Sequence, residues 1–545
     1  MKKLVILLVF ISSLLSAGNE TIIKEKPSVY ATMQCAGIQW NIEGDSNNNA
    51  ACKVEFREKG AAEWKKAMDL FRAGAVTPDK SSMATAVGWK NHMSGYVIEH
   101  WKLNYLAGSI FNLKEGTEYE VRLSLKDPDG GEAQELLAVK TRVYPVLPDL
   151  KFAKVTEVKP VARGALRKAV LAAKDGEVLL VHAGVYDGNF KVLAPVTIMA
   201  AGDGEVIIEG SMKRGSEEIE RGVNFCVPGA MFCGITVKGF PFALVMSPGA
   251  DRTAIMHCKI LDSHYSIEIQ SSENYIADNF ISGDNIPAEG SIDGEGIESH
   301  AGIGQVICYN RITRVGDALS IETPNSDVFG NDSFNNSDDA FETDDGGPNI
   351  RIFNNRLYSC LHNGMSFQPY LGGPAYFIKN QIAGFRENYF KDRYLSNGAI
   401  FINNTFLNNT KGSLLNHVYS RNNIYSCWAG PLDYHDIGPI NQGYDLDYDC
   451  FISKMPVSAG DYFEDIDQEK HGIVVKKESL FAADWNIATP PAVISPAPMF
   501  ELKDGCPAID AGVEIANITD GFAGKAPDMG AIEKGLPLPV YGPRN

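Results

Sequence analysis

One pattern of small, apolar and polar residues recurs in the middle of the chain, between about residues 222 and 430. In five segments the second residue is small and the third is large and apolar; these are residues 265–270, 295–300, 317–322, 339–344 and 363–368. Their starts are 30, 22, 22 and 24 residues apart. A repeat of this length indicates stacked coils of a parallel β-helix, each coil adding one strand to the same sheet. The longer first interval leaves room for a loop at residues 284–294.

A column of asparagines supports the same register. Each follows an apolar strand, and they recur at intervals of 21 to 25 residues: Asn310, Asn331, Asn355, Asn380 and Asn404. Stacked at one turn of successive coils, their side-chain amides can hydrogen-bond to one another along the axis, which satisfies groups that burial would leave unpaired. We therefore expect these five residues to form a ladder inside the β-helix.

The segment before the repeats predicts a cap. Residues 165–173 have the spacing of a short amphipathic helix, and an Asp-Gly turn, an apolar strand at 178–181 and a Gly-x-Tyr turn follow. With the repeats, this order resembles the N-terminal cap and first coil of the pectate-lyase-like right-handed parallel β-helix superfamily, which contains polysaccharide lyases and glycoside hydrolases. The resemblance implies an all-β fold whose helix covers the open end of the core, and activity on a polysaccharide.

Residues 27–145 predict a β-sandwich in front of the β-helix. Short segments such as 38–42 and 53–57 alternate apolar and polar residues and are separated by turn residues. Residues 113–123 resemble the end of a fibronectin type III domain, where a tyrosine, here Tyr119, closes a corner before a strand. The resemblance implies that Trp40 lies in the core of the sandwich and that this domain is a spacer or docking module without chemistry.

The first residues have the features of a signal peptide. A basic start is followed by an apolar run at residues 4–15 and then by small residues, and the run is too short to span a membrane. The expected parts of the chain are a signal peptide at 1–18, the sandwich at 27–145, a proline-rich linker at 146–160, the β-helix at 161–450 and a capping segment at 451–545. We expect a soluble, exported monomer that is secreted, periplasmic or attached to the cell surface.

Charge and cysteine content narrow the possible partners. A formal net charge of -18 argues against nucleic acid and anionic membranes as partners, and an acidic polysaccharide would need local cations to offset the repulsion. Ten cysteines are too few for a disulfide framework in a chain of this length. Cys35 and Cys52 either pair with each other or are buried free thiols.

Two columns of polar side chains are expected on the outside of the repeated strand. Because the third and fifth residues point inward, the fourth and sixth point outward. The fourth-position column is Glu268, Glu298, Ser320, Glu342 and Ser366, and the sixth-position column is Gln270, His300, Glu322, Asp344 and Gln368. Neither column contains Lys or Arg. Carboxylates stacked about 5 Å apart raise each other's pKa, so this density indicates a site. The alternative is an acidic surface that follows from composition alone.

The columns predict three kinds of functional residue. The catalytic candidates are Glu298, Glu322, Glu342 and Asp344 as general acid and base, with His300 tuning them or relaying a proton. The substrate-binding candidates are Glu268, Gln270, Gln368, Tyr370 and Arg351. The candidate ligands for a metal, expected to be Ca²⁺ if one is bound, are Asp338, Asp339 and Asp345.

Several functions stay open from the sequence. The pair Asp338-Asp339 resembles the Asp-Asp pair of the polygalacturonase type, but the chain has neither the Gly-His-Gly of that type nor the Arg-x-Pro-x-x-Arg of pectate lyases. We slightly prefer a glycoside hydrolase that needs no cofactor. The alternatives are a Ca²⁺-dependent lyase or a C5-epimerase acting on a uronate polymer, and a non-catalytic glycan-binding adhesin. The basic residues considered for a lyase are Arg351, Lys379 and Arg386.

Overall fold

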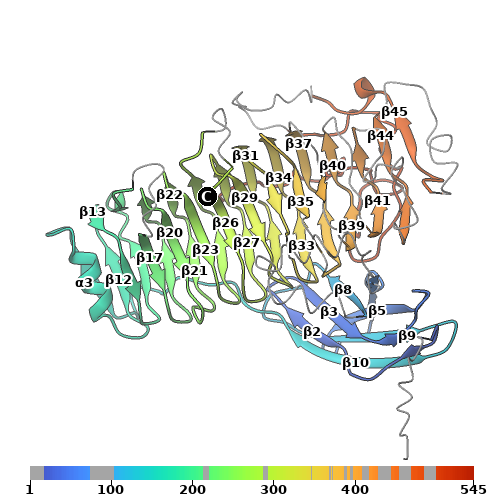
Figure 1. Ribbon diagram of the computed structural model, residues 1–545, viewed down its shortest axis with the longest axis horizontal. Helices are drawn as coiled ribbons and strands as arrows, with labels where there is room; N and C mark the ends of the chain where they lie inside the picture. The colour runs from blue at the N-terminus through green and yellow to red at the C-terminus, as the bar shows by residue number, and fades with distance from the viewer. Residues whose placement is uncertain are drawn as a thin grey trace, which may run out of the picture.

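The computed structural model is an all-β molecule in which a long parallel β-helix carries a smaller β-sandwich on one side (Figure 1). The described residues are 18–73, 104–212, 220–286, 292–344, 346–367, 370, 372–385, 390–392, 397–407, 416–426, 443–452, 468–483 and 499–544. The predicted signal peptide, Asp345, Gln368 and Arg386 therefore lie outside the described residues. Within the described part, no helix is long and apolar enough to cross a membrane.

Three parallel sheets wind into a right-handed β-helix, which confirms the predicted fold class. The first sheet contains β11 (Val155–Val158), β12 (Val178–Val181), β15 (Thr197–Ala200), β18 (Met231–Cys233), β21 (Ala254–Met256), β24 (Tyr275–Ala277), β27 (Val306–Cys308), β30 (Asp327–Phe329), β33 (Ile350–Phe353), β36 (Ala375–Ile378), β39 (Asn397–Ile402), β41 (Asn416–Arg421) and β43 (Tyr444–Asp447). The second contains β13 (Gly184–Asp187), β16 (Val206–Glu209), β19 (Thr236–Lys238), β22 (Lys259–Leu261), β25 (Phe280–Ser282), β28 (Arg311–Thr313), β31 (Asp332–Asn336), β34 (Arg356–Cys360), β37 (Gln381–Phe385), β40 (Thr405–Leu407), β42 (Ile424–Tyr425), β44 (Cys450–Ile452) and β45 (Ile473–Val475), and a 3-10 turn, η4 (Lys477–Ser479), follows it. The third contains β14 (Phe190–Val192), β17 (Arg221–Phe225), β20 (Phe242–Met246), β23 (Tyr265–Ile269), β26 (Glu295–Ser299), β29 (Asp317–Ile321), β32 (Phe341–Glu342), β35 (Met365–Phe367) and β38 (Phe390–Asp392).

The inside of the β-helix is filled by the side chains that the repeat assigned to it. The third-position residues Ile267, Ile297, Leu319, Phe341 and Met365 are all buried in one continuous core. Burying such side chains removes apolar surface from water, which is the main favourable contribution to folding. Helix α3 (Ala165–Ala172) packs Leu166 and Val170 onto the first coils, so the predicted N-terminal cap is confirmed.

The predicted asparagine ladder is present and is longer than expected. The five predicted residues are fully buried, and each Nδ2 group donates to the Oδ1 atom of the next rung at about 3.0 Å. Asn279 extends the ladder at its start, Asn423 extends it at its end, and Asp449 accepts from Asn423 as the last rung. The ladder thus ties the register of eight successive coils.

Two antiparallel four-stranded sheets form the N-terminal domain. One orders β10 (Glu132–Lys140), β9 (Glu118–Lys126), β5 (Ala51–Glu58) and β6 (Lys65–Lys66); the other orders β2 (Ser28–Ala31), β3 (Ala36–Asn41), β8 (Tyr105–Ile110) and β7 (Phe71–Ala73); a small ribbon pairs β1 (Thr21–Ile22) with β4 (Glu43–Gly44). Trp40 is buried in the core, and the Tyr119 hydroxyl accepts a hydrogen bond from the Lys114 amide. Both features agree with a fibronectin type III-like domain, which stays a prediction. Cys35 and Cys52 are buried free thiols rather than a disulfide.

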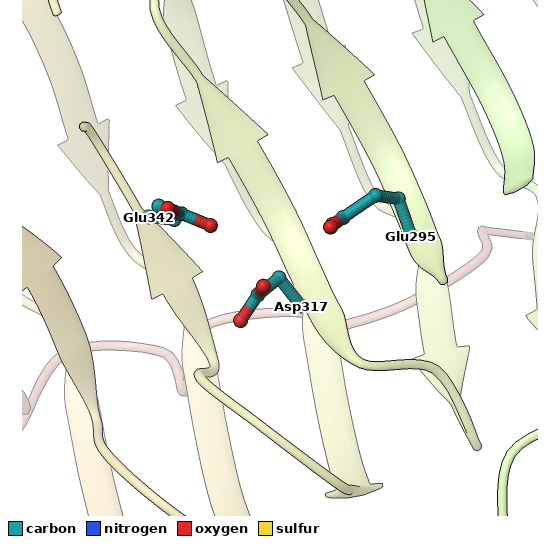
Figure 2. A group of neighbouring side chains, drawn as sticks. All are labelled: Glu295, Asp317 and Glu342. Atoms are coloured by element: carbon teal, nitrogen blue, oxygen red, sulfur yellow. The ribbon is translucent and has the colours of Figure 1, made fainter. Parts of the chain in front are cut away.

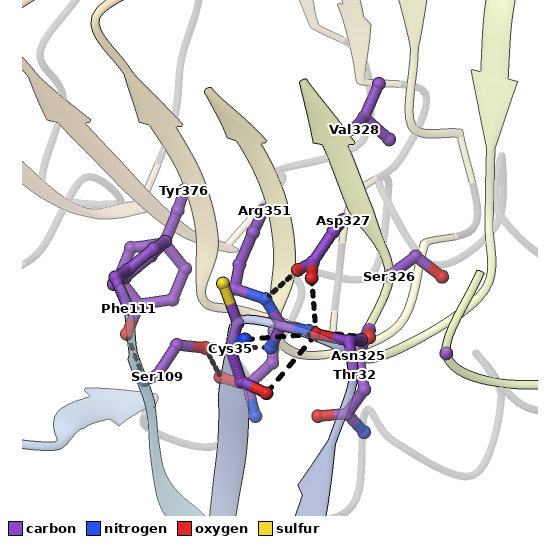
Figure 3. A network of polar contacts seen from close by, with 12 residues as sticks. Thr32, Cys35, Ser109, Phe111, Asn325, Ser326, Asp327, Val328, Arg351 and Tyr376 are labelled. Carbon is purple, nitrogen blue, oxygen red and sulfur yellow. Dashed lines mark hydrogen bonds and ion pairs between the residues drawn. The ribbon is translucent and has the colours of Figure 1, made fainter. Parts of the chain in front are cut away.

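A buried polar network fixes the sandwich against the first sheet of the β-helix (Figure 3). Arg351 on β33 pairs its Nε with Asp327 Oδ1 on β30 at 2.5 Å, and neither side chain is exposed. From the sandwich, Thr32 donates to the other Asp327 oxygen, and Ser109 Oγ lies 3.2 Å from Arg351 Nη1. Arg351 therefore holds the two domains together and lies on a different sheet from the acidic columns, so the expectation that it binds substrate is not met.

The C-terminal segment does more than cap the far end. Its described part, residues 499–544, runs back along the turns between the first and second sheets. Asn403 Nδ2 donates to the Asp528 carbonyl at 2.7 Å, Gly542 N donates to the Gly330 carbonyl at 2.8 Å, and Arg544 pairs with Asp278 at 2.7 Å. The segment therefore straps coils that are far apart in the stack. The segment expected to be a linker contains β11, which already pairs with β12.

Candidate functional site

The third sheet carries the fourth-position column in the predicted register. Backbone pairing places Glu268 beside Glu298, then Ser320, Glu342 and Ser366. The column continues one coil further, because Ser366 on β35 pairs with Lys391 on β38. The predicted positions contain no Lys or Arg, but the column ends one coil beyond them at a basic residue, Lys391. Lys391 was missed because its coil lacks the small second residue of the repeat.

A third column of acidic side chains, at the first position of the repeat, lies beside the two predicted ones. Glu295 on β26 pairs with Asp317 on β29, and the Asp339 amide donates to Asp317 Oδ1 at 2.7 Å. The small second residue explains this geometry. A Cβ on Gly296 would lie 2.4 Å from the Ala318 carbonyl oxygen, so the next coil leaves no room for a larger side chain. The aligned repeats contain Glu295 and Asp317 at the first position, but alternation along the strand predicts only the fourth and sixth positions to face outward.

Glu295, Asp317 and Glu342 come from three successive strands and direct their carboxyl groups into one shared space (Figure 2). One oxygen of each lies within 4.8 Å of the others. We call these three residues the acid trio. Among the described residues, Glu295 Oε2 is buried and has no hydrogen-bond partner. The acid trio therefore gathers three carboxyls around a space that holds no cationic side chain among the described residues.

A second group shares Asp317 with the acid trio and reaches the surface. Oxygens of Asp317, Asp338 and Asp339 also lie within 4.8 Å of one another. Asp339 is nearly fully buried, and its Oδ2 pairs with Lys391 Nζ at 2.8 Å. Asp338 keeps 13% of its side chain exposed, and His362 Nδ1 lies 3.1 Å from its Oδ1. Of the predicted metal ligands, Asp338 and Asp339 are thus together, each beside a cationic or potentially cationic partner.

Burial and mutual repulsion favour the protonated form of the acid trio. Burial is the largest cause of a pKa well above the ordinary value for each of the three groups. Neighbouring carboxylates add to it, with Glu298 acting on Glu295, Glu295 on Asp317 and Asp317 on Glu342. A carboxyl that keeps its proton near neutral pH is suited to donate it in general acid catalysis.

His300 bridges two of the predicted catalytic carboxylates. Its Nε2 lies 2.6 Å from Glu298 Oε1 and its Nδ1 lies 2.9 Å from Glu322 Oε1. Burial lowers the pKa of His300, but the hydrogen bonds to Glu298 and Glu322 raise it more, and the net pKa is about 10. Burial raises the pKa of Glu322 despite this partner. His300 is therefore an imidazolium at neutral pH, which suits it to stabilise charge rather than to accept a proton.

Of the remaining predicted residues, some lie at or near the site and one lies inside the β-helix. Asp344 Oδ1 accepts a hydrogen bond from Ser366 Oγ at 2.9 Å, at the edge of the site. Gln270 donates to the buried Glu268, one coil before Glu298. Tyr370 is 1% exposed, and its hydroxyl donates to the Gly347 carbonyl at 2.8 Å inside the β-helix. Tyr370 therefore has no surface on which a sugar can stack, because its ring turns inward after β35.

Comparisons with known proteins add little to this geometry. No family model matches the chain, and no curated protein matches it. Two solved structures are similar at a low level: both are catalytic domains of GH87 alpha-1,3-glucanase variants in complex with tetrasaccharides. Each is 12% identical, the alignments cover 71% and 77% of this chain and 92% of those chains, and the TM-scores are 0.22 and 0.19. At this level of similarity they carry no argument about the site or its substrate.

Proposed function

We propose that this protein is an exported glycoside hydrolase that cleaves a polysaccharide at the carboxyl cluster of the third sheet. One observation carries the proposal: neighbouring carboxyl groups lie in opposite electrostatic environments. In the acid trio Asp317 is buried and Glu295 and Glu342 are half-buried, and no described cationic side chain pairs with them, while Asp338 and Asp339 lie beside His362 and Lys391. A carboxyl with a raised pKa beside a carboxyl that has a cationic partner supplies the two groups that glycosidic bond cleavage requires.

The geometry favours Asp317 as the general acid. Asp317 belongs to both groups, its pKa is raised by burial first and then by Glu295, and Asp339 fixes its orientation through the backbone amide. In the proposed step the proton of Asp317 passes to the glycosidic oxygen as its bond to the anomeric carbon breaks. Glu295 and Glu342 act on this step indirectly, because their closeness disfavours loss of that proton.

Asp338 is the best candidate for the second carboxylate. It is the more exposed member of the Asp-Asp pair, and His362 contacts it from the next coil. Oxygens of Asp338 and Asp317 lie within 4.8 Å of each other, closer to the separation of retaining than of inverting glycosidases, so in the proposed step Asp338 attacks the anomeric carbon as Asp317 protonates the leaving oxygen. Water, deprotonated by Asp317, then cleaves the glycosyl ester and frees Asp338, so the net reaction adds one water across the glycosidic bond. Glu298 and His300 lie on the coil before Asp317, and Glu322 lies on the same coil as Asp317. In the proposed arrangement these three side chains contact sugar hydroxyl groups beside the cleaved bond.

A glycan panel tests this proposal. The purified chain is incubated with neutral and acidic polysaccharides, and reducing ends and unsaturated uronates are followed separately, with and without a chelator. We expect new reducing ends from at least one glycan, no unsaturated product and no effect of the chelator. Unsaturated ends would identify a lyase. Unchanged glycans throughout, with retained binding, would favour the glycan-binding adhesin.

A Ca²⁺-dependent lyase is the second candidate, and the acid trio is the observation that favours it. Three carboxylates, each with one oxygen within 4.8 Å of the others, supply the oxygen ligands that Ca²⁺ prefers, and Glu295 Oε2 has no hydrogen-bond partner among the described residues. These residues would hold the ion, and the ion would supply positive charge to neutralise a uronate carboxylate. This set fits the ion better than Asp338 and Asp339, because each of those already has a partner.

Calorimetric titration with Ca²⁺ separates the two candidates. If the acid trio is protonated, as we propose, protein that has been treated with a chelator binds no Ca²⁺ at micromolar affinity. Adding Ca²⁺ then leaves its melting temperature unchanged. If it is a cation site, binding is tight and is lost on Glu295→Gln. Glu322→Gln serves as the control, because it removes a carboxylate from the same face but lies outside the acid trio. If Glu295→Gln loses Ca²⁺ binding and Glu322→Gln keeps it, the proposal that the acid trio is protonated is overturned.

A further inference from the structure

The outward-facing side chains of the third sheet differ on the coils before the acidic cluster. The first-position column continues upstream from Glu295 through Tyr265 and Phe242 to Arg221, since Arg221 pairs with Phe242 and Phe242 pairs with Tyr265. The fourth-position column continues through Val245 and Asn224 to Lys191. The first-position column therefore changes from acidic to aromatic to basic along the β-helix axis, while Val245 and Asn224 of the fourth-position column are buried.

Neither basic side chain on this surface has an ionic partner among the described residues. Lys191 is exposed on β14, and Arg221 is half-buried on β17. The Arg221 Nε atom is buried and has no hydrogen-bond partner in the described part of the chain. An unsatisfied buried donor on a guanidinium costs free energy unless another group accepts from it. The Arg221 guanidinium therefore has a donor that no described residue of the chain satisfies.

The aromatic residues join the basic end to the acidic cluster. Phe242 and Tyr265 stack with ring centroids 4.7 Å apart and planes 8° apart, and the Arg221 guanidinium lies 5.9 Å from the Phe242 centroid. Both rings remain half-buried rather than buried. Such rings offer apolar surface to the C–H groups of a sugar. Arg221 lies four strands before Asp317, about 19 Å at the usual strand spacing, a distance that a chain of several sugars spans.

We propose that Arg221, Lys191, Phe242 and Tyr265 form a subsite that binds a sugar unit with an anionic substituent, several units from the bond that is cleaved. The proposal rests on the proposed function, because it assigns a substrate class to the same face. It also resolves the charge problem of an acidic protein. The cationic side chains of Arg221 and Lys191 attract the part of the glycan that lies upstream of the acidic cluster.

The test measures binding separately from cleavage. The full chain carrying Asp338→Asn is titrated with a uronic-acid hexasaccharide, a sulfated hexasaccharide and a neutral hexasaccharide. We expect one anionic hexasaccharide to bind more tightly than the neutral one and to lose affinity as salt is added. Adding Arg221→Gln or Lys191→Gln should weaken that binding about tenfold each, as expected for loss of a charge-assisted contact. The uronic-acid and sulfated arms identify the substituent.

Lys238→Gln is the matched control, because Lys238 is exposed on β19 of the second sheet and has no ionic partner among the described residues. It should leave every affinity unchanged. The proposal is overturned if no anionic hexasaccharide binds, or if Arg221→Gln leaves the anionic affinity unaltered. The experiment distinguishes failure of the subsite proposal from failure of the proposed hydrolase function. Arg221-dependent binding without new reducing ends in the unsubstituted chain refutes only cleavage, while cleavage that ignores Arg221 refutes only the subsite.

Discussion

Replacing Asp317 with asparagine should lower the rate of glycan cleavage about a thousandfold while leaving the coils folded. Positioned acids and bases contribute about 10²- to 10⁴-fold to the rates of such reactions. Asp317 belongs to both clusters of carboxyl residues in the site. An asparagine keeps the Oδ1 atom that accepts from the Asp339 amide, so the local backbone is retained. The measurement is kcat on the glycan that the panel identifies, with circular dichroism as the check on folding.

The same substitution should change how the stability of the folded chain depends on pH, in a direction set by the pKa of Asp317. Burial and then Glu295 raise the pKa of Asp317 in the folded chain above its ordinary value, which the unfolded chain keeps. The stability linked to its proton is therefore fully present at acidic pH and is lost as pH rises through the raised pKa. Asparagine has no proton to lose. In chelator, Asp317→Asn should thus melt at a higher temperature than the unsubstituted chain at pH 8, although it is inactive.

Glu205→Gln is the control for both measurements, because Glu205 is exposed and lies away from the third sheet. It should change neither kcat nor the pH dependence of melting. An Asp317→Asn protein that cleaves at the normal rate would remove Asp317 from the mechanism. One that is inactive and also melts lower at pH 8 would show that the substitution damages the fold instead.

Replacing Arg351 with methionine should destabilise the chain by about 3–5 kcal/mol, the usual result of breaking a buried ion pair from one side. The change leaves the Asp327 carboxylate buried with Thr32 as its remaining donor in this network. Ser109 also loses its contact with the guanidinium, so the sandwich should dock less firmly. Urea unfolding followed by tryptophan fluorescence and by circular dichroism measures both effects, since a sandwich that detaches first gives two separate transitions.

Arg252→Met provides the comparison for the buried pair. Arg252 pairs with Glu273 but keeps 71% of its side chain exposed, so its loss should cost less than about 1 kcal/mol. Combining Arg351→Met with Asp327→Leu should recover part of the lost stability, because no uncompensated charge remains. Equal losses for Arg351→Met and Arg252→Met would contradict the assigned role of this network.

The sequence predicts the repeating part of the molecule well, because each coil repeats the same physical constraints. The inward third position must be apolar, and the buried asparagines must pair, so Ile297 or Asn331 can be placed by counting. Arg351 could not be placed in this way. Its position on the first sheet is outward, and only the sandwich that covers that sheet makes it buried. Contacts between domains leave no periodic signal in either partner.

The site was predicted in part for the same reason. Glu298 and Glu342 follow from alternation along the strand, and the pairing of the strands places them in one column. Asp317 lies where the chain enters the strand, and alternation alone does not say which way such a residue points. Lys391 lies on a coil whose sequence departs from the repeat, and His362 lies in a turn. Their nearness to the acids depends on loop paths that the repeat does not encode.

The C-terminal strap changes how the stack can come apart. In a linear array each coil contacts only its neighbours, so such arrays can fray from an end, one coil at a time. Here Arg544 is attached at Asp278 and Gly542 at Gly330, while Asp528 is attached at Asn403, many coils later. The last coils cannot peel away while the strap holds the middle ones. Hydrogen exchange should therefore report opening of the central and distal coils as one event, with no gradient towards the C-terminal end.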